Sequence, residues 1–186
     1  MNDTTLRKLL TFYEYLLTVR DPYEDGHSKR VCKYALHLAN ELKYSDSFLK
    51  GLAAGARFHD IGKLLCPAKL LTLPSVDTDE LMMLQRHTLH GYMICQLLSI
   101  EYPLLQIIAQ HHENYDGSGY YLKLAGEGIF EGARIVRICD SFDAMTSDRS
   151  YGIKRTKLEA IDELTRCGGF FDPKMLDVFI NTVEMQ

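Results

Sequence analysis

The sequence lacks the features that mark membrane, secreted and nucleic-acid-binding proteins. No stretch approaches the length of an apolar transmembrane helix. The N-terminal segment MNDTTLRKLLTFYEYLL has no unbroken apolar run of the kind that a signal peptide requires. The net charge of −4 excludes the basic footprint expected of a protein that binds DNA or RNA. We therefore expect neither a nucleic acid polymer nor a membrane among its partners.

Paired cysteine motifs are also missing. The chain has five cysteines, an odd number, and none of them has CxxC spacing. Each has apolar neighbours, so we interpret them as reduced, buried, small hydrophobic residues: Cys32, Cys66, Cys95, Cys139 and Cys167. Reduced cysteines indicate the cytoplasm, where we expect this protein to be located.

Strand patterns, internal repeats and low-complexity tracts are absent too, and helical periodicity dominates. The 186 residues are enough for one domain with a substantial core, and the hydrophobic share of 46% is typical of a soluble protein. We predict an all-α bundle of seven to nine helices. One apolar stripe covers 6–17, and a second helix begins at an Asp21 cap. The remaining helices are expected at 46–60, 78–99 with a break near Gly91, 101–113, 132–147, 155–166 and 172–184.

The segments between these helices predict the organisation of the domain. Residues 1–20 form an amphipathic helix that either packs on its own domain or pairs with a second copy in a homodimer. Residues 21–186 form the functional domain. Within it, 66–80 reads as a connector, and 116–132 reads as the one long loop, with five of the chain's 13 glycines.

Two polar doublets are difficult to explain as parts of an ordinary core. Neighbours on a helix point about 100° apart, so a packed interior does not favour two adjacent polar side chains. Buried polar groups need partners, and a metal ion would supply them. The doublets are His59-Asp60 and His111-His112.

Three single residues extend this pattern. His27 lies on the apolar face of its helix, His87 begins another helical stretch, and Asp140 has mostly apolar neighbours. A lone histidine is more often a hydrogen-bonded core residue, which is how we interpret His37 and His90, and Asp140 could instead pair with Arg137. Together with the doublets, five histidines and two aspartates fit a two-metal site in a helical bundle. Mixed imidazole and carboxylate ligands suit iron, manganese or zinc rather than calcium.

Lys63 indicates what such a site binds. It lies four residues after His59, on the same face of a helix. An ammonium group beside a metal cluster is useful where it meets an anion, of which phosphate is the commonest. The alternative is a surface lysine that extends into solvent.

The motifs RDPYEDGHSKRV, HDIGK, HHENYDGSGY and RICDSFDAMTSDRSY, in this order, resemble the HD-GYP family. These are bacterial phosphohydrolases of the HD superfamily that degrade cyclic di-GMP, and the similarity covers nearly the whole chain after about residue 20. The resemblance implies an HD-type helical bundle with a dimetal site, holding iron or manganese. It also implies substrate contacts by Lys63 and Arg149. The implied metal ligands are His27, His59, Asp60, His87, His111, His112 and Asp140.

The resemblance also implies that the loop after the histidine doublet contacts substrate through Gly117, Gly119 and Tyr120. The ring of Tyr120 could stack on a base or cover it. In the family this loop also meets partner proteins, so we expect contacts of 113–121 with GGDEF-type or other signalling proteins. The family sequence ends in Gly-Tyr-Pro, whereas this chain has Tyr121 in the place of proline. Because proline fixes φ, we expect a more mobile loop here, and we expect Tyr121→Pro to improve turnover unless the Tyr121 ring itself stacks on guanine.

A second departure concerns the number of metals. Family members with a third metal carry an acidic residue four positions before the first histidine ligand, and here that position is Tyr23. The sequence therefore favours two divalent transition metals.

The predicted function is hydrolysis of cyclic di-GMP to the linear dinucleotide or GMP. The nucleophile would be a hydroxide that bridges the metals, with Asp60 orienting it and Lys63 and Arg149 holding phosphate. Three alternatives stay open. The substrate could be another cyclic dinucleotide or nucleotide, the chain could be a weakly active or inactive signalling adaptor, or it could be a di-iron oxygenase.

Overall fold

The computed structural model describes residues 3–20, 26–73, 75–100, 102–147 and 154–184. These residues form helices and loops without a strand, and nine of the helices have seven residues or more, so the predicted all-α fold is confirmed. The α-helices are α1 (Asp3–Arg20), α2 (His27–Glu41), α3 (Asp46–Phe58), α4 (Ala68–Leu71), α5 (Thr78–Gln85), α6 (His87–Leu97), α7 (Leu104–Gln110), α8 (Glu131–Thr146), α9 (Lys157–Arg166) and α10 (Pro173–Glu184). Three short 3-10 helices join them: η2 (Ile61–Leu65), η3 (Gly126–Gly128) and η4 (Gly168–Phe170).

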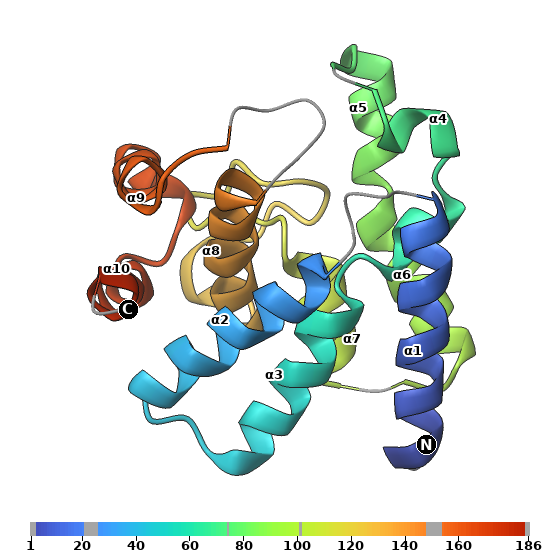
Figure 1. Cartoon of the computed structure of the whole chain (residues 1–186), viewed down its shortest axis with the longest axis horizontal. Coiled ribbons are helices and arrows are strands. Elements are labelled where there is room, and N and C mark those ends of the chain that lie inside the picture. Colours follow the sequence, from blue (N-terminus) through green and yellow to red (C-terminus); the bar gives the residue numbers. More distant parts are fainter. Residues whose placement is uncertain (1–2, 21–25, 74, 101, 148–153, 185–186) are drawn as a thin grey trace.

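The central layer of the bundle is formed by α2, α3, α7 and α8 (Figure 1). Helix α2 packs against both α3 and α8, and α7 packs against α3 and α8. Their facing sides are apolar and fully buried, as the helical periodicity of the sequence requires. Helices α9 and α10 cover one side of this layer. The helices that carry His27 and Asp140, α2 and α8, therefore form part of the main core.

A second, smaller core lies on the other side, where η2 packs against α6 and α1. The Tyr13 ring of α1 stacks on Phe58 at 5.5 Å between ring centroids, and Tyr13 and Leu17 are buried. The outward face of the same helix exposes Phe12, Tyr15 and Val19. Helix α1 thus packs on its own chain with one face, while its assignment as a separate segment and its pairing with a second copy stay predictions.

Several helix boundaries differ from those expected. Helix α2 begins at His27, because Gly26 has a φ of 72° and cannot continue a helix; the expected cap Asp21 lies outside the described residues. The expected helix 78–99 is divided at Arg86 rather than near Gly91. Helix α7 begins only after Pro103 and ends at Gln110, so the histidine doublet follows the helix rather than lying in it.

Helices α4 and α5 project from one end of the bundle (Figure 1), and the segment expected as a connector contains the four-residue α4. Among the described residues, no helix combines the length and the apolar character needed to cross a membrane.

Candidate metal centre

The centre is built around Asp60, which follows the end of α3 at Phe58 and precedes η2. The next turn packs unusually closely on α6. A Cβ atom added to Gly62 would lie 1.8 Å from the backbone oxygen of His87 and 2.5 Å from the backbone nitrogen of Gly91. Glycine at this position is therefore what allows the Asp60 segment to lie directly against the helix that carries His87.

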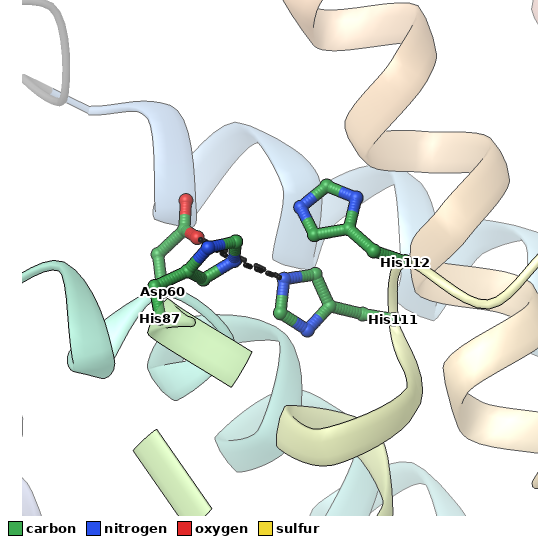
Figure 2. Close-up of side chains that lie close together, drawn as sticks. All are labelled: Asp60, His87, His111 and His112. Atoms are coloured by element: carbon green, nitrogen blue, oxygen red, sulfur yellow. Dashed lines mark hydrogen bonds and ion pairs between the residues drawn. The ribbon is translucent and has the colours of Figure 1, made fainter. Parts of the chain in front are cut away.

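One group of ligand atoms comes from Asp60, His87, His111 and His112, and these atoms all lie within 4.8 Å of one another. Figure 2 shows these side chains converging from separate parts of the fold. His87 is the first residue of α6, and the doublet follows α7. Asp60 Oδ1 lies 3.3 Å from His87 Nε2 and 3.8 Å from His111 Nε2.

A second group comes from His27, His59 and Asp60. Asp60 Oδ2 lies 3.1 Å from His59 Nε2 and 3.9 Å from His27 Nε2. Asp140 on α8 borders this group, with Oδ1 3.2 Å from His27 Nε2 and 4.0 Å from His59 Nε2. Arg137, the alternative partner considered for Asp140, instead donates hydrogen bonds to Asn114 and Ser141.

Asp60 belongs to both groups, and its two oxygens are divided between them. Oδ1 faces His87 and His111, whereas Oδ2 faces His59 and His27. A carboxylate placed in this way can bind one ion with each oxygen. The structure thus brings together all seven residues expected as ligands, and their role as ligands stays a prediction.

Three of the histidines are oriented by hydrogen bonds to backbone oxygens on the side away from the centre. Nδ1 of His59, His87 and His111 lies 2.7 to 2.9 Å from the backbone oxygens of Ala56, Leu84 and Ile108, respectively. A carbonyl oxygen can only accept, so each of these Nδ1 atoms carries the proton. In the neutral ring, Nε2 then presents its lone pair to the centre, as a metal ligand must.

The local electrostatics keep lone pairs available on three histidines. Burial lowers the pKa of His87 to about 3, although the charge of Asp60 opposes it. Burial also lowers the pKa of His111, and it holds the pKa of His112 well below its ordinary value, helped by the neighbouring His111 and His87. These imidazoles are therefore neutral near pH 7, which is the form that binds metals.

The carboxylates are kept in the charged form. Burial raises the pKa of Asp60, but the charges of His59 and Lys63 outweigh it and hold that pKa well below its ordinary value. For Asp140, burial is likewise outweighed by the hydrogen bond and charge of His27, which hold its pKa well below normal. The centre thus combines anionic oxygens with the neutral imidazoles of His87, His111 and His112.

Unsatisfied polar atoms show that this donor set fits metal ions. Nε2 of His87 and Nε2 of His111 lie 3.2 Å apart, although both rings carry their proton on Nδ1. Two lone pairs therefore face each other in the protein interior. Nε2 of His59 and Oδ1 of Asp60 are also buried and make no hydrogen bond among the described residues. A cation in each group would satisfy these atoms.

Two acidic residues near the centre were not singled out from the sequence. Asp143 on α8 accepts a hydrogen bond of 2.7 Å from His27 Nδ1 and another of 2.7 Å from Arg30 Nε. Glu113 follows the doublet and accepts hydrogen bonds from the backbone N–H groups of Leu122 and Leu124. The sequence signals were weak: Asp143 is one turn after Asp140 on the same face, and Glu113 adjoins His112.

Four of the residues expected to contact substrate lie beside the centre, Lys63 at the Asp60 oxygen of the second group and Gly117, Gly119 and Tyr120 beside the first. Lys63 Nζ is 2.8 Å from Asp60 Oδ2. The half-buried Tyr120 stacks on His112, with ring centroids 4.6 Å apart. Gly117 has a φ of 83°, which glycine adopts without strain, and Gly119 lies against the backbone of His112, Glu113 and Asn114. Arg149 lies outside the described residues.

Tyr121, the variant residue, does not reach the centre. Its hydroxyl donates a hydrogen bond of 2.8 Å to the backbone oxygen of Met82 on α5, and 40% of the residue is exposed. A proline at this position could not make that contact.

Comparison with known proteins gives consistent matches over most of the chain. Residues 12–175 match the family model described as HD domain. The chain is 34% identical over 169 residues to a cyclic di-GMP phosphodiesterase of Pseudomonas aeruginosa, covering 90% of this chain and 41% of the relative. It is 33% identical over 152 residues to the 3'3'-cGAMP-specific phosphodiesterase 3 of Vibrio cholerae, covering 81% of this chain and 33% of that relative. The chain therefore spans less than half the length of these two relatives.

The fold also matches a solved structure. An HDG"Y"P protein from Bdellovibrio bacteriovorus superposes with a TM-score of 0.74 at 21% sequence identity, covering 89% of this chain and 53% of that one. At this level of identity the match shows a shared fold.

Proposed function

The chain belongs to the HD domain family and to its HD-GYP branch, and from this membership we propose that it is a metal-dependent phosphodiesterase that opens a cyclic dinucleotide. We propose cyclic di-GMP as the substrate, with the linear dinucleotide or GMP as the product. The observation that carries this proposal is the division of the Asp60 oxygens between two groups of histidines. One carboxylate shared in this way can serve two neighbouring ions.

The proposed ligands of the first ion are Asp60, His87, His111 and His112. The second would be held by Asp60, His27, His59 and Asp140. When bound, two such ions lower the pKa of a water molecule so that it can act as a nucleophile, and they neutralise charge on phosphoryl oxygens. We propose iron or manganese, because mixed imidazole and carboxylate donors suit these metals.

The chain's own residues would position the phosphodiester. Lys63 reaches the same side of Asp60 as the second group, so its ammonium can hold a phosphoryl oxygen beside that ion. Arg149, which lies outside the described residues, is proposed to hold phosphate through its planar pair of donors. Tyr120 covers His112 and would limit the access of bulk water on that side, and its ring is the proposed contact for a base.

A nucleotide hydrolysis screen tests this function. Protein reconstituted anaerobically with iron or with manganese would be incubated with cyclic di-GMP, 3'3'-cGAMP and nucleoside monophosphates, and the products separated. We expect hydrolysis of cyclic di-GMP, lost in Asp60→Asn, which keeps only one oxygen for two ions. The exposed Asp162→Asn on α9 is the matched control. Cleavage of nucleoside monophosphates alone would overturn the proposal.

A second candidate function is favoured by the surface beside the centre. Tyr121 and Leu122 are 40% and 45% exposed, in the loop that follows the doublet. A metal-loaded chain that binds cyclic dinucleotide without turnover would instead act as a signalling adaptor, with the 113–121 loop contacting a GGDEF-type or other signalling protein. The same screen separates the two functions, because the adaptor would return the nucleotide intact.

A further inference from the structure

At the last turn of α5, the loop that contains Tyr121 meets His87, one of the proposed metal ligands. A helix leaves its last four backbone oxygens without partners inside the helix. In α5, which ends at Gln85, these belong to Met82, Met83, Leu84 and Gln85. Each of them is satisfied by a group outside the helix, so the position of this turn depends on those groups.

Two of the four partners belong to the metal centre or the loop beside it. The Met82 oxygen accepts the hydroxyl of Tyr121 at 2.8 Å, and the Leu84 oxygen accepts Nδ1–H of His87 at 2.7 Å. The other two partners are local: the Arg86 N–H bonds to Met83 at 3.3 Å, and the Thr88 hydroxyl bonds to Gln85 at 3.2 Å. Tyr121 is therefore the one of these four that ties the turn to a distant part of the sequence.

The loop that carries Tyr121 is fixed beside His112, another member of the same metal group. Tyr120, the residue before Tyr121, stacks on His112. The next residue, Leu122, donates its N–H to the carboxylate of Glu113, which directly follows His112. The Tyr121 side chain thus connects the loop beside His112 to the last turn of α5, whose Leu84 oxygen orients His87.

We infer that Tyr121 is a positioning residue for the ion bound by Asp60, His87, His111 and His112. The Tyr121 hydroxyl holds the last turn of α5 through the Met82 oxygen. The Leu84 oxygen in the same helical turn then fixes the ring of His87. In this account the tyrosine supplies a contact that the family's proline cannot make, which reverses the expectation that proline would improve the site. The inference deepens the proposed function, because it concerns one of the two ions which that function needs.

The variant Tyr121→Phe removes the hydroxyl and keeps the ring. In metal-free protein we expect the Arg86 amide to exchange with deuterium about three- to tenfold faster, which corresponds to the loss of one ordinary hydrogen bond. In a titration with manganese we expect the affinity of one ion to fall by about the same factor and that of the other to stay unchanged. Tyr121→Pro should reproduce both losses.

The matched control is Tyr92→Phe on α6, which removes a hydroxyl that accepts a hydrogen bond of 3.0 Å from Gln96 instead. It should leave the Arg86 amide and both affinities as in the parent protein. The inference is overturned if Tyr121→Phe leaves the exchange rate unchanged, if it speeds exchange without weakening either ion, or if Tyr92→Phe has the same effects. Neither measurement uses a nucleotide, so both can succeed in a chain that fails to hydrolyse cyclic dinucleotides.

Discussion

His27 and Asp143 are joined by a hydrogen bond of 2.7 Å between Nδ1 and Oδ2, although they lie 116 positions apart in the sequence. The carboxylate fixes the proton of His27 on Nδ1 and so turns Nε2 toward Asp60 and Asp140. Partners of this kind raise the basicity of a ligand imidazole and hold its orientation.

Removing this partner should weaken one ion selectively. We expect Asp143→Ala to lower the affinity of the ion in the His27 and His59 group by about 10- to 100-fold. A competition titration with a chromophoric chelator measures this, with the exposed Asp162→Ala as control. Equal affinities in Asp143→Ala and the parent would show that the carboxylate has no part in metal binding.

Gly62 should be intolerant of even a methyl group. A Cβ there would lie 1.8 Å from the backbone oxygen of His87, so η2 and α6 would have to separate. We expect Gly62→Ala to lower the free energy of unfolding by about 1–3 kcal/mol, as overpacking does, and to reduce the metal content. At Gly128 a Cβ would meet no atom within 4 Å, so Gly128→Ala is the matched control in denaturant unfolding. Similar midpoints for the two variants would contradict the close approach.

The metal-free protein should lose stability as the pH falls. The pKa of His87 drops from 6.5 in the unfolded chain to about 3 in the fold. Between these values the unfolded chain holds a proton that the folded protein does not, so acid favours unfolding, by up to about 1.4 kcal/mol per pH unit for each such histidine. The lowered pKa values of His111 and His112 act in the same direction. The raised pKa of His59, which Asp60 causes against the effect of burial, acts oppositely.

Urea unfolding of the metal-free protein between pH 7.5 and pH 5 checks this expectation. The free energy of unfolding should decrease over this range, and the decrease should be shallower in His87→Gln. A free energy that is constant or rises toward pH 5 would mean that these histidines are not buried in neutral form.

The two faces of α1 should respond differently to truncation. Tyr13 is 3% exposed and stacks on Phe58, so Tyr13→Ala should cost about 3–5 kcal/mol of unfolding free energy. Tyr15 is 67% exposed, so Tyr15→Ala should change that free energy by no more than about 0.5 kcal/mol. Thermal unfolding with sedimentation analysis tests both variants. A Tyr15→Ala chain that is markedly destabilised and changes its association state would show that α1 pairs with a second copy.

The sequence indicated which residues meet at the centre, but it did not indicate the residue that orients His27. Adjacent polar residues in apolar surroundings pointed to His59-Asp60 and His111-His112, because such doublets need partners wherever they are buried. The role of Asp143 depends on His27, which the fold brings to it from the other end of the chain. Nothing in the local pattern around Asp143 indicates that contact.

The break between α5 and α6 was predicted near Gly91 rather than at Arg86 for a related reason. The segment LMMLQRHTLHGY has no helix-breaking residue before Gly91, so its local preferences predict one helix. The helix ends at Gln85, and of its last four backbone oxygens that of Met82 bonds to the distant Tyr121 hydroxyl while the other three bond to local groups. The all-helical fold could be predicted from periodicity, whereas the contact of Tyr121 at this break joins residues that are distant in the sequence.

In the proposed function one carboxylate, Asp60, serves two ions that act together. The most direct test measures the rate of cyclic di-GMP hydrolysis while manganese or iron is added anaerobically to metal-free protein in known molar ratios. We predict little turnover up to one metal per chain and a rate that rises to its plateau as the second is bound. A full rate with one metal per chain, or no hydrolysis with two, would contradict the account.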